Sequence, residues 1–127
     1  MIIIGDELVS YEDIFFISSK DEIKNTKANS TIAFGYNEEL LKYSLENSLS
    51  SAVEVKTIKE AIYVNALEGK YIIAEKNLAI SLQKIADNYM FDSKILALID
   101  SNDEFEEVAN NEIDGVIYKN LLKWKSS

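Results

Sequence analysis

The sequence predicts an α/β fold, namely a three-layer sandwich with a mainly parallel, five-stranded sheet and an added N-terminal strand pair. Two observations lead to this prediction. From residue 31 onward, short runs rich in β-branched and aromatic residues alternate with longer segments of helical period, which is typical of parallel strands joined by crossover helices. The strand runs are also almost continuously apolar, as expected of strands covered on both faces.

The first thirty residues follow a different pattern. The apolar runs 1–4 and 14–17 are separated by an acidic stretch that contains Gly5-Asp6, and they predict a strand pair or hairpin. Ser19-Lys20-Asp21-Glu22 has the form of a capping box, in which a hydroxyl and a carboxylate satisfy two free backbone N–H groups. We expect a short helix after it, ending at about Lys27.

The rest of the chain is expected to repeat βα units. We expect one domain over residues 1–127, with the strand pair and short helix in 1–30 and the repeated units in 31–127. The five predicted strands are Thr31–Gly35, Ala52–Val55, Tyr71–Glu75, Ile95–Ile99 and Gly115–Tyr118.

Helix start signals fall between these strands. Asn37 precedes two glutamates, a helix cap with acids in the first turn. Capping boxes recur at Thr57-Ile58-Lys59-Glu60 and at Ser101-Asn102-Asp103-Glu104. The longest helix is predicted from about Asn77 to Tyr89, and its wide apolar stripe indicates extra burial.

The helix after Thr57 is predicted to pack one apolar face on the core and to end at Gly69. Glycine there would adopt the left-handed conformation that closes many helices. The predicted core-facing residues are Ile58, Ala61, Ile62, Asn65 and Ala66.

Size, composition and charge narrow the class of protein. A chain of 127 residues with 47% hydrophobic and 28% charged residues has the composition of one folded domain. The net charge of −9 repels polyanions and disfavours nucleic-acid binding. The apolar start ends at Gly5 with no basic segment before it, so we expect neither a signal peptide nor a membrane span. These features predict a cytoplasmic protein.

Several residue types on which catalysis usually depends are missing. The chain contains no histidine, cysteine, arginine or proline. Disulfides and thiolate zinc sites are therefore excluded, and the commonest general base near neutral pH is absent. We assign no catalytic residue, no metal site and no cofactor, and we favour a protein that is not an enzyme.

Three segments are similar to parts of a known family. Residues 53–61 resemble a strand that runs into a helix opening with a Glu-Ala pair, and residues 71–75 resemble the following strand. Residues 115–119 resemble a last strand that ends in a lysine. Over about residues 31–122, the chain resembles the receiver domains of two-component response regulators, which have a flavodoxin-like fold. The resemblance places Glu75 where receivers have their phospho-accepting Asp, and Lys119 where they have the lysine that pairs with the phosphoryl group.

The chain departs from the receiver pattern at its active residues. Receivers hold Mg²⁺ with an acidic pair after the first strand, where this chain has Gly35-Tyr36-Asn37. At the end of the fourth strand, Asp100 stands in place of the switching Ser or Thr, and Asn120 in place of a proline. The resemblance therefore implies a receiver-like fold without phosphotransfer.

Candidate binding residues follow from the sheet. In an open α/β sheet, ligands bind at the carboxyl ends of the strands. Helix N-termini and lysines there suit a small phosphorylated or carboxylated ligand, although the same residues serve equally well as helix caps and solvated lysines. The predicted ligand-binding residues are Asn37, Lys56, Thr57, Glu75, Lys76, Asp100, Ser101 and Lys119.

The C-terminal tail reverses the charge of the chain. Residues 119–125 contain three lysines and the only tryptophan, Trp124. Tryptophan is enriched at binding hot spots, so Trp124 is a predicted partner contact. The alternative is that Leu121, Leu122 and Trp124 pack back as a shortened last helix.

Two functional hypotheses follow. The first is a non-catalytic protein-interaction or regulatory module that acts on a protein partner or associates with itself, as a homodimer through the broad helix of residues 77–91. The alternative is a small-ligand binding protein or modest enzyme that uses the carboxyl-end rim of the sheet. On that alternative the converging residues are Lys56, Glu75, Lys76, Asp100 and Lys119.

Overall fold

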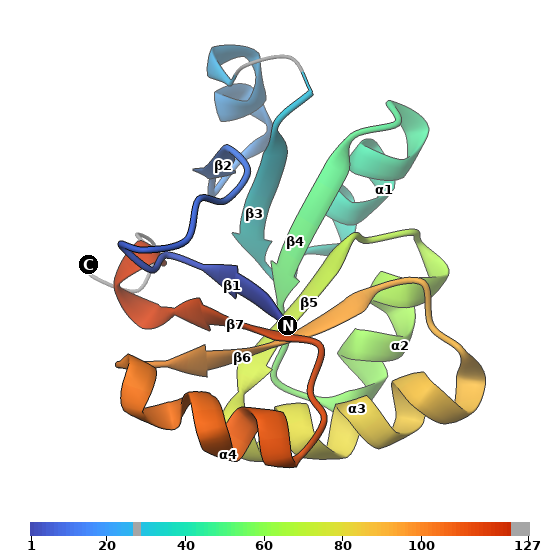
Figure 1. Ribbon diagram of the computed structural model, residues 1–127. Coiled ribbons are helices and arrows are strands. Elements are labelled where there is room, and N and C mark those ends of the chain that lie inside the picture. The colour runs from blue at the N-terminus through green and yellow to red at the C-terminus, as the bar shows by residue number, and fades with distance from the viewer. Residues whose placement is uncertain (27–28, 123–127) are drawn as a thin grey trace.

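The computed structural model describes residues 1–26 and 29–122 and shows one parallel sheet flanked by helices (Figure 1). The predicted α/β class is confirmed. Within these residues the sheet has seven strands, in the order β1-β7-β6-β5-β4-β3-β2. The strands are β1 Ile2–Ile4, β2 Ile14–Phe16, β3 Thr31–Gly35, β4 Ser50–Glu54, β5 Tyr71–Glu75, β6 Lys94–Ile99 and β7 Gly115–Tyr118.

Helices connect successive strands. The α-helices are α1 Glu38–Glu46, α2 Ile58–Ala66, α3 Lys76–Tyr89 and α4 Phe105–Asn110. The 3₁₀ helices are η1 Lys20–Asn25, η2 Asn102–Glu104 and η3 Lys119–Leu121.

The N-terminal strand pair is corrected by the structure, as is the count of five strands. β1 pairs in parallel with β7, from Ile2 against Gly115 to Ile4 against Ile117, while β2 pairs in parallel with β3. The two strands lie at opposite edges of the sheet and form no hairpin. Both strands are short apolar runs. Each pairs with a strand outside its immediate sequence neighbourhood, so the local residue pattern does not indicate which strand is the partner.

The helices pack against one face of the sheet. From β2 to β7 each strand lies beside the next in the chain, and right-handed crossovers then put every connecting helix on the same side. Helices α1 to α4 all contribute to one buried cluster, and Figure 1 shows them in succession round the outside of the sheet. This layering is more one-sided than the expected sandwich, and the strand order differs from the 2-1-3-4-5 order of flavodoxin-like sheets.

The other face of the sheet buries a second cluster. Its members come from the strands and from Leu122, which follows η3. Ile4 of β1 belongs to this cluster, and Phe16 of β2 packs against it. Because both edge strands reach the same cluster, the sheet curls round it as an open barrel with the helices outside.

The predicted helix caps are present. Asn37 Oδ1 accepts a hydrogen bond from Leu40 N at 3.0 Å, and Thr57 Oγ1 accepts one from Glu60 N at 3.1 Å. Ser19 and Ser101 both form their capping boxes. These caps fix where η1, α1, α2 and η2 leave the carboxyl end of the sheet, whereas α3 has no side-chain cap.

Gly69 does not adopt the predicted left-handed conformation. Glu68 does so instead, with a φ of 64°. The structure gives another reason for glycine at position 69, since an added Cβ would lie 2.4 Å from Val64 Cγ1.

The amino end of the barrel is closed by a polar cluster centred on Glu12. This residue belongs to the connection from β1 to β2. Its carboxylate accepts hydrogen bonds from Thr31 Oγ1 and Tyr71 Oη, both at 2.5 Å, and from Lys70 Nζ at 2.9 Å. Burial alone would raise the pKa of Glu12, but the hydrogen bonds from these three partners outweigh burial and lower it.

Candidate functional site

The carboxyl ends of the strands form the rim on which the predicted ligand-binding residues lie. Because the strands are all parallel, their carboxyl ends meet at one end of the barrel, where ligands bind in parallel α/β folds. The structure brings Glu75, Lys76 and Lys119 together round one hollow of about 260 Å³. Its full lining is Glu75, Lys76, Asn77, Leu98, Glu104 and Lys119.

The other predicted residues lie elsewhere on the rim. Asp100 and Ser101 line a neighbouring hollow of about 570 Å³ with the residues that follow β1. Asn37 lines a third hollow between the ends of β2 and β3. Lys56 and Thr57 follow β4, where Thr57 caps α2. The eight residues therefore share an end of the barrel without converging on one cavity.

Lys76 links the start of α3 to the segment after β6. Its Nζ lies 2.8 Å from Glu104 Oε1 and 2.8 Å from Glu107 Oε1. The pKa of Lys76 is raised mainly by its hydrogen bond to Glu104 and next by its hydrogen bond to Glu107. The pKa of Glu104 is lowered by Lys76 and by the backbone N–H groups that it caps. Lys76 is thus a structural cation with two carboxylates already bound.

Lys56 pairs with a buried acid that sequence analysis did not single out. Lys56 Nζ lies 2.9 Å from Glu54 Oε2, and the Glu54 side chain is only 3% exposed. A buried carboxylate is costly unless it is paired. The signal in the sequence is an acid at the end of an apolar strand, two residues after Ala52 and hence on the inner face of the sheet.

Lys119 makes a looser contact. Its Nζ lies 3.5 Å from Asp100 Oδ2, and both side chains are well exposed, so the pair contributes little. Each of the three predicted lysines on the rim nevertheless has a carboxylate as its neighbour. An anionic ligand would have to compete with those carboxylates. Among the described residues, no group of three or more acids is placed to hold a metal ion.

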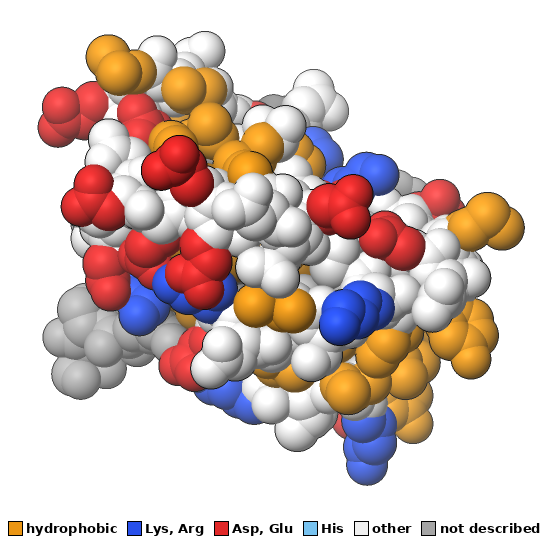
Figure 2. Space-filling view, turned by 60° about the horizontal axis from the view of Figure 1, so that its bottom comes forward, with side chains coloured by type: hydrophobic (Ala, Val, Ile, Leu, Met, Phe, Trp, Pro, Cys, Tyr) orange, Lys and Arg blue, Asp and Glu red, His pale blue; other side chains and the backbone are white. Residues whose placement is uncertain are grey.

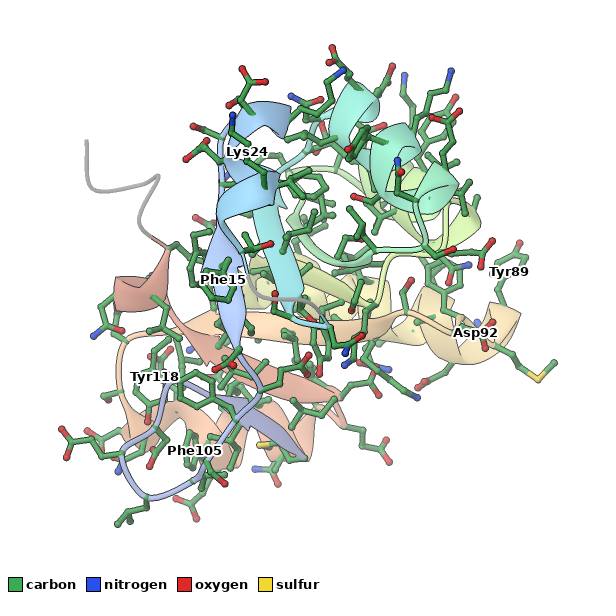
Figure 3. All side chains as sticks on the ribbon, turned by 90° about the horizontal axis from the view of Figure 1, so that it is seen from above. Phe15, Lys24, Tyr89, Asp92, Phe105 and Tyr118 are labelled. Atoms are coloured by element: carbon green, nitrogen blue, oxygen red, sulfur yellow. The ribbon has the colours of Figure 1, made fainter. Side chains whose placement is uncertain are left out.

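A contact between the ends of β1 and β7 was also missed. Tyr118 Oη donates a hydrogen bond of 2.6 Å to Asp6 Oδ2. This bond is the main reason that the pKa of Tyr118 rises to about 12 and that the pKa of Asp6 falls. The Tyr118 ring also packs edge to face on Phe105, as Figure 3 shows. The two partners are 112 positions apart in the chain, so local pattern cannot reveal the bond.

The predicted core face of α2 is confirmed at Ala61 but is wrong at Ile58, Ile62 and Ala66, which are exposed and belong to a second candidate surface. The buried residues of α2 are Ala61 and Val64. Ile58 and Ile62 are 41% and 50% exposed, and Tyr63 is 49% exposed. We call Ile58, Lys59, Ile62, Tyr63 and Ala66 the α2 face; all five are exposed.

The outward faces of the other α-helices are mainly polar, with Leu45 of α1 and Tyr89 of α3 as exposed large apolar exceptions. The exposed residues of α1 include Glu38, Glu39, Lys42 and Glu46; those of α3 include Ser81, Lys84, Asp87 and Asn88; those of α4 include Glu106, Glu107 and Asn110. In Figure 2, hydrophobic side chains gather toward the lower right of the view and, separately, at its upper left. The α2 face is therefore exceptional among the helices of this protein.

The end of α3 extends the apolar surface near α2. Tyr89 and Met90 are 76% and 84% exposed, and Figure 3 shows Tyr89 projecting away from the body of the protein. Ser93 N donates to Asn65 Oδ1 at 3.2 Å, which joins this segment to the end of α2. Leu82 and Ala86 of the α3 stripe are buried in the protein's own core, while Leu78, Ile80 and Ile85 are half-buried.

The C-terminal segment is described as far as Leu122. Leu122 is 2% exposed in the inner cluster, and Leu121 packs against that cluster. The expected packing of these two leucines is confirmed. Trp124 lies outside the described residues, and its role as a partner contact stays a prediction.

Comparisons with known proteins add no relative. No model of a known protein family matches the chain, and no curated protein matches it significantly. Among the described residues, no helix has both the length and the apolar character needed to span a membrane.

Proposed function

We propose that this chain is a non-catalytic protein-interaction module whose contact surface is the α2 face. The observation that supports the proposal is the exposure of Ile58, Ile62 and Tyr63 on one helix. Apolar surface that is removed from water contributes about 25 cal/mol per Å². A contiguous exposed apolar surface on a folded domain is typical of interaction sites.

The choice of residues within α2 strengthens this argument. The helix buries Ala61 and Val64 and leaves larger side chains in water. Packing alone would favour the opposite orientation, because burying isoleucine removes more apolar surface than burying alanine. A helix that only covers the sheet would carry mainly polar residues outward, as α1, α3 and α4 do.

The rim supports a non-catalytic role. Lys56, Lys76 and Lys119 are each next to a carboxylate, and Asn37, Thr57 and Ser101 cap helices. These ion pairs and helix caps explain why the residues are present, and no catalytic role is needed to explain them. The proposal does not depend on the resemblance to receiver domains.

Site-specific photocrosslinking in cells tests the proposal. A photoreactive amino acid in place of Tyr63 is expected to give a covalent adduct with a protein, because that position lies in the proposed contact. The matched control replaces Lys42, an exposed position on α1, and is expected to give none. If position 63 gives no adduct, or no more than position 42, the α2 face is not an interaction surface.

A second candidate function is the binding of a small ligand at the rim. It is favoured by the convergence of Glu75, Lys76 and Lys119 on one hollow. A thermal-shift screen with nucleotides, phosphosugars and small carboxylates tests it. A ligand at a hundred times its dissociation constant adds about 2.7 kcal/mol, and Lys119→Ala is expected to abolish that shift. A hit that is unchanged in Lys119→Ala places the ligand elsewhere.

A further inference from the structure

We propose that the partner of the α2 face is a second copy of this chain, bound with the two α2 helices antiparallel about a two-fold axis at Ile62. This inference rests on the proposed interaction function and names its partner. The observation that supports it is that the α2 face is complementary to a copy of itself related by a two-fold axis.

The spacing of the apolar residues suits antiparallel contact. Ile58, Ile62 and Ala66 are four positions apart and form one stripe along α2. A two-fold axis at Ile62 sets Ile62 against the partner's Ile62 and Ile58 against the partner's Ala66. A large side chain then meets a small one at both ends, which allows the two helices to approach closely. Parallel pairing would instead set Ile58 against itself.

The polar flank of the stripe is also self-complementary. Lys59 and Tyr63 lie on the same side of the stripe, one turn apart. In a two-fold antiparallel pair, the equivalent flanks of the helices meet, so Lys59 lies beside the partner's Tyr63. An ammonium over a tyrosine ring is an attractive contact, and the symmetry makes it twice. The chain already forms such contacts within itself, with Lys70 Nζ 5.2 Å from the centroid of the Tyr71 ring.

The charge of the α2 face permits two acidic chains to meet. The whole chain carries −9, so two copies repel each other at long range. The charged member of the α2 face is Lys59, while Glu60 is turned toward the domain and accepts a hydrogen bond from Lys56 N at 2.8 Å. The attraction is then apolar and the repulsion electrostatic. Added salt screens the long-range repulsion more than the short-range contacts and should therefore strengthen the dimer.

The size of the surface sets the expected affinity. One nine-residue helix, extended by Tyr89 and Met90, buries less than the roughly 1,200 Å² of a standard stable interface. We therefore expect a reversible dimer whose population depends on protein concentration.

Analytical ultracentrifugation of the full chain, from about 1 µM to about 1 mM, tests the dimer. The wild-type mass is expected to rise from one chain toward two, and more so at high salt. Ile62→Lys places two lysines at the axis and should stay monomeric. Leu45→Lys makes the same change at an exposed leucine of α1 and should behave as the wild type. Circular dichroism checks that both variants fold. A monomeric wild type, an Ile62→Lys dimer as strong as the wild type, or dissociation by salt overturns the proposal.

Cysteine crosslinking fixes the geometry. The chain contains no cysteine, so Ile62→Cys carries a single thiol. At a two-fold axis the two Cβ atoms lie within the roughly 4 Å range that a disulfide needs, and mild oxidation is expected to give a covalent dimer. Leu45→Cys should not give one. Equal crosslinking of both variants, or none at position 62, overturns the antiparallel pair.

The outcomes separate this inference from the proposed function. A photocrosslink from position 63 to a different protein, together with a monomeric wild type, overturns the homodimer and leaves the interaction module standing. No adduct and no dimer overturn both.

Discussion

The two ends of the barrel differ in how their polar residues are used. At the amino end, one carboxylate, that of Glu12, accepts short hydrogen bonds from Thr31, Tyr71 and Lys70. At the carboxyl end, polar side chains are spread over several hollows, and the Lys119–Asp100 pair is long and exposed. The difference indicates that the polar contacts of the amino end depend on one carboxylate, while those of the carboxyl end are distributed over separate pairs, of which the Lys119–Asp100 pair tolerates change.

The largest expected effect is at the amino end. Glu12→Ala removes the acceptor shared by three donors and leaves Thr31 and Tyr71 without it. We expect a loss of about 3 kcal/mol in the free energy of unfolding, measured by urea denaturation. The control is Glu7→Ala, since Glu7 is exposed and its loss should cost less than about 0.5 kcal/mol. If Glu12→Ala and Glu7→Ala lower the free energy of unfolding by equal amounts, the Glu12 cluster does not stabilise the amino end in the way described.

The same cluster should make stability depend on pH. The folded pKa of Glu12 is lowered from an ordinary value near 4.5, so its contribution is fully present above that value and is lost as the pH falls through the folded pKa. Glu12→Gln lacks this titration. The stability difference between wild type and Glu12→Gln should therefore narrow as the pH falls from 6 to 3. A difference that stays constant over this range would mean that Glu12 is not held as a carboxylate.

A smaller effect is expected at Glu54, the buried acid of the rim. Lys56→Ala removes the 2.9 Å ion pair from this carboxylate. The expected loss is about 1 kcal/mol, less than for a fully buried pair because Lys56 itself is exposed. Lys84→Ala, which changes an exposed lysine on α3, is the matched control in urea unfolding. A loss as large as that of Glu12→Ala would mean that the carboxyl end is also structural.

The smallest effect is expected for Lys119→Ala. Its ion pair with Asp100 is 3.5 Å long with both side chains exposed, so the free energy of unfolding should change by less than about 0.5 kcal/mol. The same variant serves in the ligand screen because it leaves the fold intact. A loss above about 1 kcal/mol would show that this part of the rim is structural.

Sequence reasoning succeeded where the signal is local. Three of the five expected strands, including Thr31–Gly35, have the predicted bounds, and the caps at Asn37 and Thr57 are formed. A capping box or an apolar strand is contained within a few neighbouring residues. The rim could be predicted for the same reason, because a parallel strand fixes where its own carboxyl end lies.

Sequence reasoning failed where the contact is long-range or the local pattern is ambiguous. Glu12 and Tyr71 are 59 positions apart, and Lys76 and Glu104 are 28 apart. Helix α2 has apolar residues on both its faces, so its period alone could not tell the buried side of Ala61 from the exposed side of Ile62. Only the packing of the whole domain decides between them.

The pairing of β1 with β7 constrains when the protein can finish folding. Ile2 lies opposite Gly115, so β1, which is synthesised before the other six strands described, finds its partner only after β7 has been made. The five strands from β3 to β7 can each pair with the preceding strand as they emerge from the ribosome. β1 must wait with its apolar side chains unpaired. Such a distant closing contact slows folding and leaves a nascent chain in need of protection from aggregation until β7 is available to pair with β1.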